Sequence, residues 1–183
     1  YAVSIAVQYK DAITQACIFD PNRNELFTAS KGRGAFMNDR RLRVSKVVNL
    51  ADALVATGFP FRDGQNIDEY MRQFRIAIEM TAGIRRPGAA TLDLAWVACG
   101  RVDAFWEMGL APWDVAAGSL LVTEAGGLIS DLAGESDWLH GGDVIGGTPK
   151  VFAALDRSLS FHGPPQARSQ IRFLGCGQPH RGR

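Results

Sequence analysis

The chain has 183 residues, of which 46% are hydrophobic and 21% charged, and its formal net charge is +1 at pH 7. These values are typical of a globular protein and exclude a fibrous or a wholly disordered chain. No apolar run reaches the roughly 20 residues of a bilayer span, and no signal-peptide pattern opens the sequence. We therefore expect no membrane association and a cytoplasmic location. Three widely spaced cysteines, Cys17, Cys99 and Cys176, predict neither a disulfide framework nor a zinc site.

The first 48 residues have the pattern of an antiparallel sheet. Apolar and polar residues alternate over residues 1–9, which predicts a strand. Further strands are expected at residues 13–19 and 25–29, with a turn at 21–24 between them. We assign residues 1–48 to the last strands of a first, antiparallel sheet region. Because the first strand starts without a polar leader, we expect the chain to begin inside a domain.

Residues 49–156 alternate between strand and helix patterns and form the expected α/β domain. Asn66 is the predicted N-cap of the first helix, with Glu69 placed as in a capping box and Gly83 as the predicted end. Strands are expected at 54–57, 102–106, 128–130 and 144–145, and the other helices at 90–98, 114–125 and 149–155. This order predicts an α/β layered sandwich, with antiparallel strands followed by a mostly parallel sheet covered by helices.

Residues 157–183 contain five arginines and no acidic residue, and they lack a sustained hydrophobic period. We expect a flexible or non-native tail here. A basic arm for nucleic acid is the alternative, but the segment lacks interleaved lysines and an aromatic stacking platform. Nucleic acid is therefore not an expected partner.

Asp114 opens a predicted helix of small and apolar residues. At a helix start a carboxylate faces the positive end of the helix dipole, where it can cap the helix or hold a cation. From this residue alone, capping is the commoner role. The segment from Ala111 to Gly127, however, contains Trp-Asp-x-Ala-Ala-Gly and ends in Thr-Glu-Ala-Gly-Gly. It resembles the second signature of the inositol monophosphatase family, Mg²⁺-dependent and lithium-sensitive phosphatases, and this resemblance implies that Asp114 is a Mg²⁺ ligand.

Other segments resemble the same family. They are residues 19–29 with the Gly-x-Gly-Ala turn at 32–35, residues 56–61 and residues 100–103. The resemblance therefore covers the chain from Tyr1 to about Leu155. It implies the inositol monophosphatase/sugar phosphatase fold.

Two further positions are candidates for substrate binding. Gly88 is followed by Ala89 and Ala90 before a helix, where backbone amides can approach a ligand, although an ordinary turn fits as well. Glu107 follows a strand at the edge where open α/β sheets bind ligands, although a solvated loop acid is commoner. The family resemblance implies that Gly88, Ala89 and Ala90 line the substrate pocket. It also implies that Glu107 accepts hydrogen bonds from ring hydroxyls of the substrate.

One part of the family pattern is not found in this sequence. The other metal-binding carboxylates of the family come from an upstream Glu and an Asp-Pro-x-Asp-Gly-Thr motif, whereas Asp20-Pro21 here lacks the rest of that motif. We therefore expect a fragment without the family's N-terminal part. One carboxylate cannot hold a catalytic metal cluster tightly, so little or no phosphatase activity is expected of this chain by itself.

The resemblance implies that the full gene product is a Mg²⁺-dependent phosphomonoesterase for inositol monophosphates or similar small polyol phosphates. A homodimer is possible, since family members are commonly dimers. An alternative is a non-catalytic member that acts through protein partners in transcription or ribosome assembly, as some bacterial members do. A third possibility is a phosphatase for fructose bisphosphate or bisphosphate nucleotides.

Overall fold

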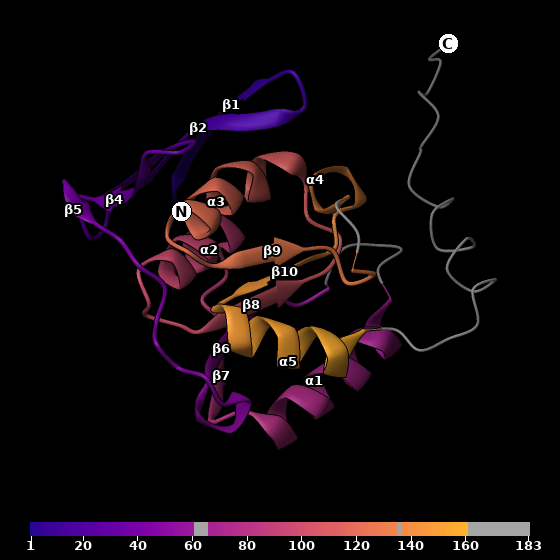
Figure 1. Ribbon diagram of the computed structural model, residues 1–183. Helices are drawn as coiled ribbons and strands as arrows, with labels where there is room; N and C mark the ends of the chain where they lie inside the picture. Colours follow the sequence, from indigo (N-terminus) through magenta and orange to yellow (C-terminus); the bar gives the residue numbers. More distant parts are fainter. Residues whose placement is uncertain (61–65, 135–136, 161–183) are drawn as a thin grey trace, which may run out of the picture.

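The computed structural model describes residues 1–60, 66–134 and 137–160. Its first layer is an antiparallel sheet whose strands are neighbours in chain order (Figure 1). They are β1 (Val3–Tyr9), β2 (Ala12–Asp20), β3 (Glu25–Ser30), β4 (Gly34–Met37) and β5 (Arg40–Arg41). The expected antiparallel region is confirmed. Residues with even numbers on β2 and odd numbers on β3 face the core, and Ile18 pairs with Phe27 there, both fully buried.

The second sheet has the strand order β7-β6-β8-β10-β9. The strands are β6 (Leu54–Thr57), β7 (Gly83–Arg85), β8 (Ala104–Glu107), β9 (Leu128–Ser130) and β10 (Val144–Gly147). Strand β6 is parallel to β7 and to β8, but β10 is antiparallel to β8 and to β9. The sheet is therefore mixed: four strands run in one direction, as the predicted mostly parallel sheet requires, and β10 runs in the other. Strands β8 and β9 do run in the same direction, as in a βαβ unit, but β10 inserts between them in the opposite direction.

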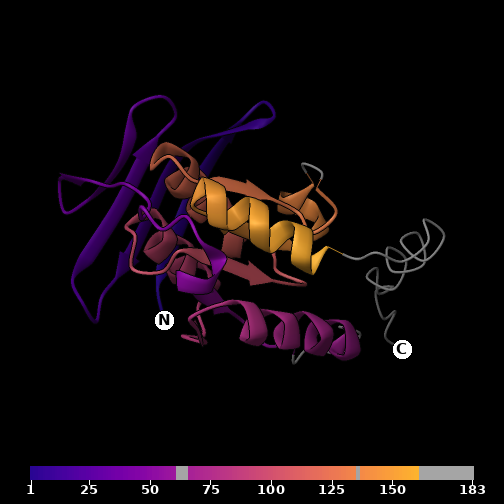
Figure 2. The same ribbon diagram turned by 60° about the horizontal axis from the view of Figure 1, so that its bottom comes forward.

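The helices form two further layers, as the predicted layered sandwich requires. They are α1 (Ile67–Met80), α2 (Ala90–Ala98), α3 (Pro112–Glu124), α4 (Trp138–Gly141) and α5 (Pro149–Leu159), with a 3₁₀ turn at Leu50–Asp52. Helices α2 and α3 lie between the two sheets, whereas α1 and α5 cover the other face of the second sheet (Figures 1 and 2). None of the helices in the described part of the chain has the length and apolar character needed to cross a bilayer.

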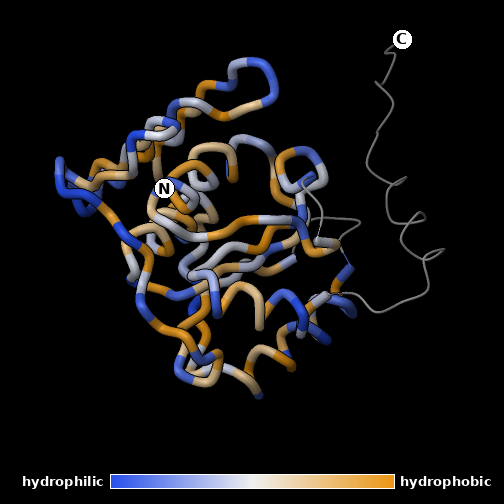
Figure 3. Tube along the Cα trace, viewed as in Figure 1, coloured by the Kyte–Doolittle hydropathy of each residue, from blue (hydrophilic) through white to orange (hydrophobic). Residues whose placement is uncertain are grey.

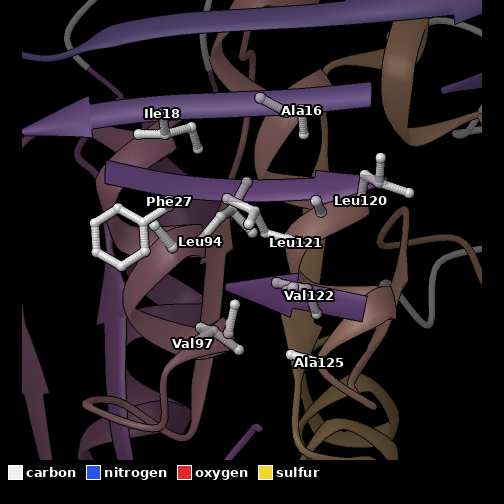
Figure 4. Close-up of a cluster of buried hydrophobic side chains, with 14 of the residues drawn as sticks. Ala16, Ile18, Phe27, Leu94, Val97, Leu120, Leu121, Val122 and Ala125 are labelled. Atoms are coloured by element: carbon white, nitrogen blue, oxygen red, sulfur yellow. The ribbon is translucent and has the colours of Figure 1, made fainter. Parts of the chain in front are cut away.

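The central helices are apolar on all sides because both sheets cover them. Every residue of α3 from Val115 to Val122 is buried. A side chain at Gly118 would collide with Leu94, so this glycine lets α2 and α3 pack closely. Figure 4 shows Ile18 and Phe27 of the first sheet beside Leu94 of α2 and residues of α3. The turns at the outer ends of the first sheet, in contrast, are hydrophilic (Figure 3).

Two helix ends differ from the sequence prediction. Helix α1 starts as expected, since the Asn66 side chain accepts a hydrogen bond from the Glu69 N–H at 3.0 Å. It stops at Met80, however, and Gly83 begins the unpredicted strand β7 instead of ending the helix.

Helix α5 continues four residues past its predicted end at residue 155. Leu155 and Leu159 lie one helical turn apart, and both are fully buried, which extends the helix into the segment assigned to the tail. Residues 157–159 are therefore helical. The remainder of the predicted tail, residues 161–183, lies outside the described residues.

Candidate active site

Asp114 closes the first turn of α3. Its Oδ2 atom accepts a hydrogen bond from the Ala111 backbone N–H at 3.2 Å, and the Asp114 N–H in turn donates to the Ala111 carbonyl at 2.9 Å. Asp114 is thus the third residue of the helix and not its N-cap, which is Ala111. A carboxylate has acceptor positions beyond this single bond, so a cation could still bind it.

The described residues do not form a Mg²⁺ site by themselves. Mg²⁺ prefers octahedral coordination by oxygen atoms, usually carboxylates and waters. Asp114 offers a suitable donor, but in the described parts of the chain no three His, Cys, Asp or Glu side chains come close enough together to hold a metal ion. Binding of Mg²⁺ at Asp114 therefore needs ligands other than those described.

The first turn of α2 presents backbone groups. Gly88 has φ +91°, in the left-handed region that favours glycine, and it turns the chain into the helix. Ala89 is the N-cap and offers no side-chain acceptor, so the first N–H groups of the helix are not capped by a side chain. Such groups at the positive end of a helix suit an anionic ligand.

Ser4 on strand β1 joins this turn to the start of α3. Its hydroxyl donates to the Trp113 carbonyl at 3.2 Å and accepts a hydrogen bond from the Thr91 hydroxyl at 3.1 Å. Through Thr91 and Trp113 these bonds link the end of the predicted substrate-binding segment Gly88–Ala90 to the helix start that carries Asp114.

Glu107 lies at the carboxyl edge of the parallel strands. It is the last residue of β8, and Gly58 follows the neighbouring strand β6. The Glu107 carboxylate lies directly against Gly58, in the space that a Cβ atom at this position would fill. Arg86 follows β7 and places its guanidinium 5.0 Å from the centre of the Phe59 ring. A carboxylate, a glycine and a cation thus lie at the ends of the three neighbouring strands β8, β6 and β7.

Asp93 on α2 is a site residue that the sequence interpretation missed. It is 1% exposed, and within the described part of the chain neither of its carboxyl oxygens has a hydrogen-bond partner. Burial raises the pKa of Asp93 to about 8, the nearby negative charge of Glu107 raises it too, and Arg86 lowers it. The sequence feature that could have indicated it is a single acid inside the otherwise apolar run from Leu92 to Ala98. In the structure nearly all of this helix is buried.

The layered fold and the residues around α2 and α3 identify the class of protein. The model of the inositol monophosphatase family matches residues 1–161, and the chain belongs to this family.

Among its relatives is the protein named Nus factor SuhB from Pseudomonas aeruginosa, 55% identical over 170 residues. That alignment covers 92% of this chain and 63% of the relative. Nus factor SuhB of Escherichia coli K12 is 48% identical, and the alignment covers 85% of this chain and 58% of the relative.

Solved structures agree with the assignment. The extragenic suppressor protein suhB of Bartonella henselae has a TM-score of 0.84 at 44% identity, covering 88% of this chain and 62% of that one. Inositol monophosphatase from Anabaena has a TM-score of 0.78 at 35% identity, covering 91% and 69%. The chain thus spans about three fifths of the length of the SuhB relatives named above.

Proposed function

We propose that this chain belongs to a SuhB-type protein that acts through protein partners in transcription. The observation that supports this is its 55% identity to a relative named Nus factor SuhB. Partners in ribosome assembly, a cytoplasmic location and a homodimer belong to the same proposal. A role in transcription replaces phosphatase activity as the first candidate function, because the names of the relatives favour transcription.

Binding to purified transcription complexes tests this proposal. The full-length protein is mixed with RNA polymerase elongation complexes, and its co-sedimentation is compared with that of the Pseudomonas aeruginosa relative. We expect the two proteins to associate to a similar extent. Association of the relative alone would contradict the proposal.

The geometry of the site supports a second function, hydrolysis of inositol monophosphates or similar polyol phosphates. The first turn of α2, whose amides suit an anion, is linked through Ser4 to Trp113, the residue before Asp114, and Glu107 acts electrostatically on Asp93 of the same helix. We propose that Gly88, Ala89 and Ala90 contact the substrate through their backbone and that Glu107 accepts hydrogen bonds from ring hydroxyls. Asp114 would be one of the Mg²⁺ ligands.

Glu107 and the loop at Arg86 favour a polyol ring over the sister substrates. A carboxylate recognises neighbouring hydroxyl groups as an acceptor, and a second phosphate next to it would be repelled. Fructose bisphosphate and bisphosphate nucleotides are accordingly the less favoured substrates.

Release of phosphate from inositol monophosphate with and without Mg²⁺ tests the second function. We expect turnover by the full-length protein that depends on Mg²⁺. The 183-residue chain alone should show little or none, since the described residues contain no group of three His, Cys, Asp or Glu side chains that could hold a metal ion. Equal activity of the chain and the full-length protein would refute the argument that ligands are missing.

A further inference from the structure

Gly58 is a glycine whose backbone does not require glycine. It is not among the residues with positive φ, so an alanine could adopt the same backbone conformation. The position lacks room for another reason, because a Cβ atom would coincide with the Glu107 carboxylate. The carboxylate of Glu107 therefore occupies the space that a side chain at position 58 would need.

The residues on either side of Gly58 are held by contacts with Tyr70. The preceding Thr57 is fully buried, and its hydroxyl lies 3.4 Å from the Tyr70 hydroxyl. The following Phe59 contacts the Tyr70 ring edge-on, with ring centres 5.9 Å apart, and Tyr70 stacks on the buried Trp106. If Gly58 gained a side chain, this wall would stay in place, and the carboxylate at the end of its flexible side chain would move.

Other polar and charged groups lie near the carboxylate at this edge of the sheet. Asp93 and the Tyr70 hydroxyl both lie within electrostatic range of Glu107 and Arg86, and the guanidinium of Arg86 attracts the carboxylate. In the structure the Glu107 carboxylate occupies the space over Gly58 that a Cβ atom would fill.

We propose that Gly58 is a positioning residue that fixes the Glu107 carboxylate and thereby sets the preference for phosphate esters that carry ring hydroxyls. This inference rests on the proposed phosphatase function. Gly58 acts only through Glu107 and needs no contact with the substrate.

The test compares two substrates, inositol 1-phosphate and 4-nitrophenyl phosphate, which has no ring hydroxyls. In the full-length protein, Gly58→Ala should lower kcat/KM for inositol 1-phosphate about tenfold, mainly through KM, because a hydrogen bond to a charged group is displaced. For 4-nitrophenyl phosphate the change should stay below about twofold. Gly83→Ala is the matched control, since its Cβ would meet Leu54 at an ordinary 3.5 Å.

A compensating variant separates positioning from general damage. Glu107→Asp shortens the side chain by one methylene and leaves room for a Cβ at position 58. The double variant Gly58→Ala with Glu107→Asp should therefore recover part of the loss, so that the two substitutions are not additive. Additive losses, or an equal loss on both substrates, would overturn the inference.

Failure of the proposed function gives a different result. If the wild-type protein neither hydrolyses inositol 1-phosphate nor binds it by calorimetry, both the phosphatase proposal and the role of Gly58 are overturned. If the wild type acts on inositol 1-phosphate and Gly58→Ala keeps the same preference between the two substrates, the role of Gly58 alone is overturned.

Discussion

The two sides of the candidate site are built in different ways. On one side Asp114 bonds the backbone of its own helix, and the other groups near it are hydrogen-bonded main-chain and hydroxyl groups. On the other side Glu107, Gly58 and Arg86 come from the ends of three adjacent strands, with Asp93 buried behind them.

This difference separates the two tasks of the proposed site. The groups proposed to recognise substrate hydroxyls all lie within the described residues, whereas Asp114 has no partner carboxylates there that could complete a metal site. Substrate preference and metal-dependent turnover should therefore respond to different substitutions.

The largest effect is expected on the Asp114 side. Asp114→Asn in the full-length protein keeps an oxygen that can accept the Ala111 N–H but removes the charge, so the helix start should remain intact. Turnover of inositol monophosphate should fall about a thousandfold or more. Mg²⁺-dependent phosphate release measures the loss, and circular dichroism checks the fold.

Glu107→Gln provides the comparison on the other side. It should weaken binding of inositol monophosphate about tenfold and spare 4-nitrophenyl phosphate. Normal activity of Asp114→Asn would refute its assignment as a ligand. Unchanged association of Asp114→Asn with transcription complexes would show that partner binding does not need catalysis.

Asp93 gives the next largest effect, on stability. Its pKa is about 8 in the folded protein and near 4 in an unfolded chain, so the folded state holds the proton more tightly. The contribution of Asp93 to stability is therefore highest below about pH 4 and is lost as the pH rises toward about 8. Asp93→Asn should remove this loss and raise the free energy of unfolding at pH 7 by about 2–4 kcal/mol, with little change near pH 4. Urea titrations of the full-length protein at several pH values measure it.

Asp20 is a buried acid of the opposite kind and serves as the control. Burial raises its pKa, but hydrogen bonds from the Arg23 side chain and from the backbone N–H groups of Arg23 and Asn22 outweigh this and lower it. Asp20→Asn should therefore destabilise the protein at neutral pH, with an effect that fades as the pH falls through the lowered pKa. A loss of stability in Asp93→Asn at pH 7 would contradict the burial argument.

The sequence predicted most of the fold because its local signals agree with the final structure. Strand β6 and helix α2 have the predicted bounds, and Asn66 caps α1 as expected. The sequence did not predict the direction of β10, because contacts between distant segments decide it. The place of β10 between β8 and β9 depends on sheet assembly and not on any local pattern.

The site shows the same division. Asp114 and Glu107 were found because family motifs include them, and their roles stay predictions. Asp93 was missed because one acid in an apolar helix becomes unusual only when both sheets cover that helix. The role of Gly58 could not be predicted, because it depends on the position of the Glu107 side chain. Glu107 lies 49 residues further along the chain.

The smallest expected effect is at Ser4, which joins the two helix starts that the site depends on. Ser4→Ala removes the donor to the Trp113 carbonyl and the acceptor for the buried Thr91 hydroxyl. The free energy of unfolding should fall by about 1 kcal/mol, the usual net contribution of such bonds, as measured by urea titration. Ser30→Ala is the matched control, because its exposed bond to Gln15 joins only strands of the first sheet. If Ser4→Ala also lowers turnover and Ser30→Ala does not, β1 holds the first turns of α2 and α3 in their relative positions. Equal effects of the two variants would mean that the helices keep these positions without Ser4.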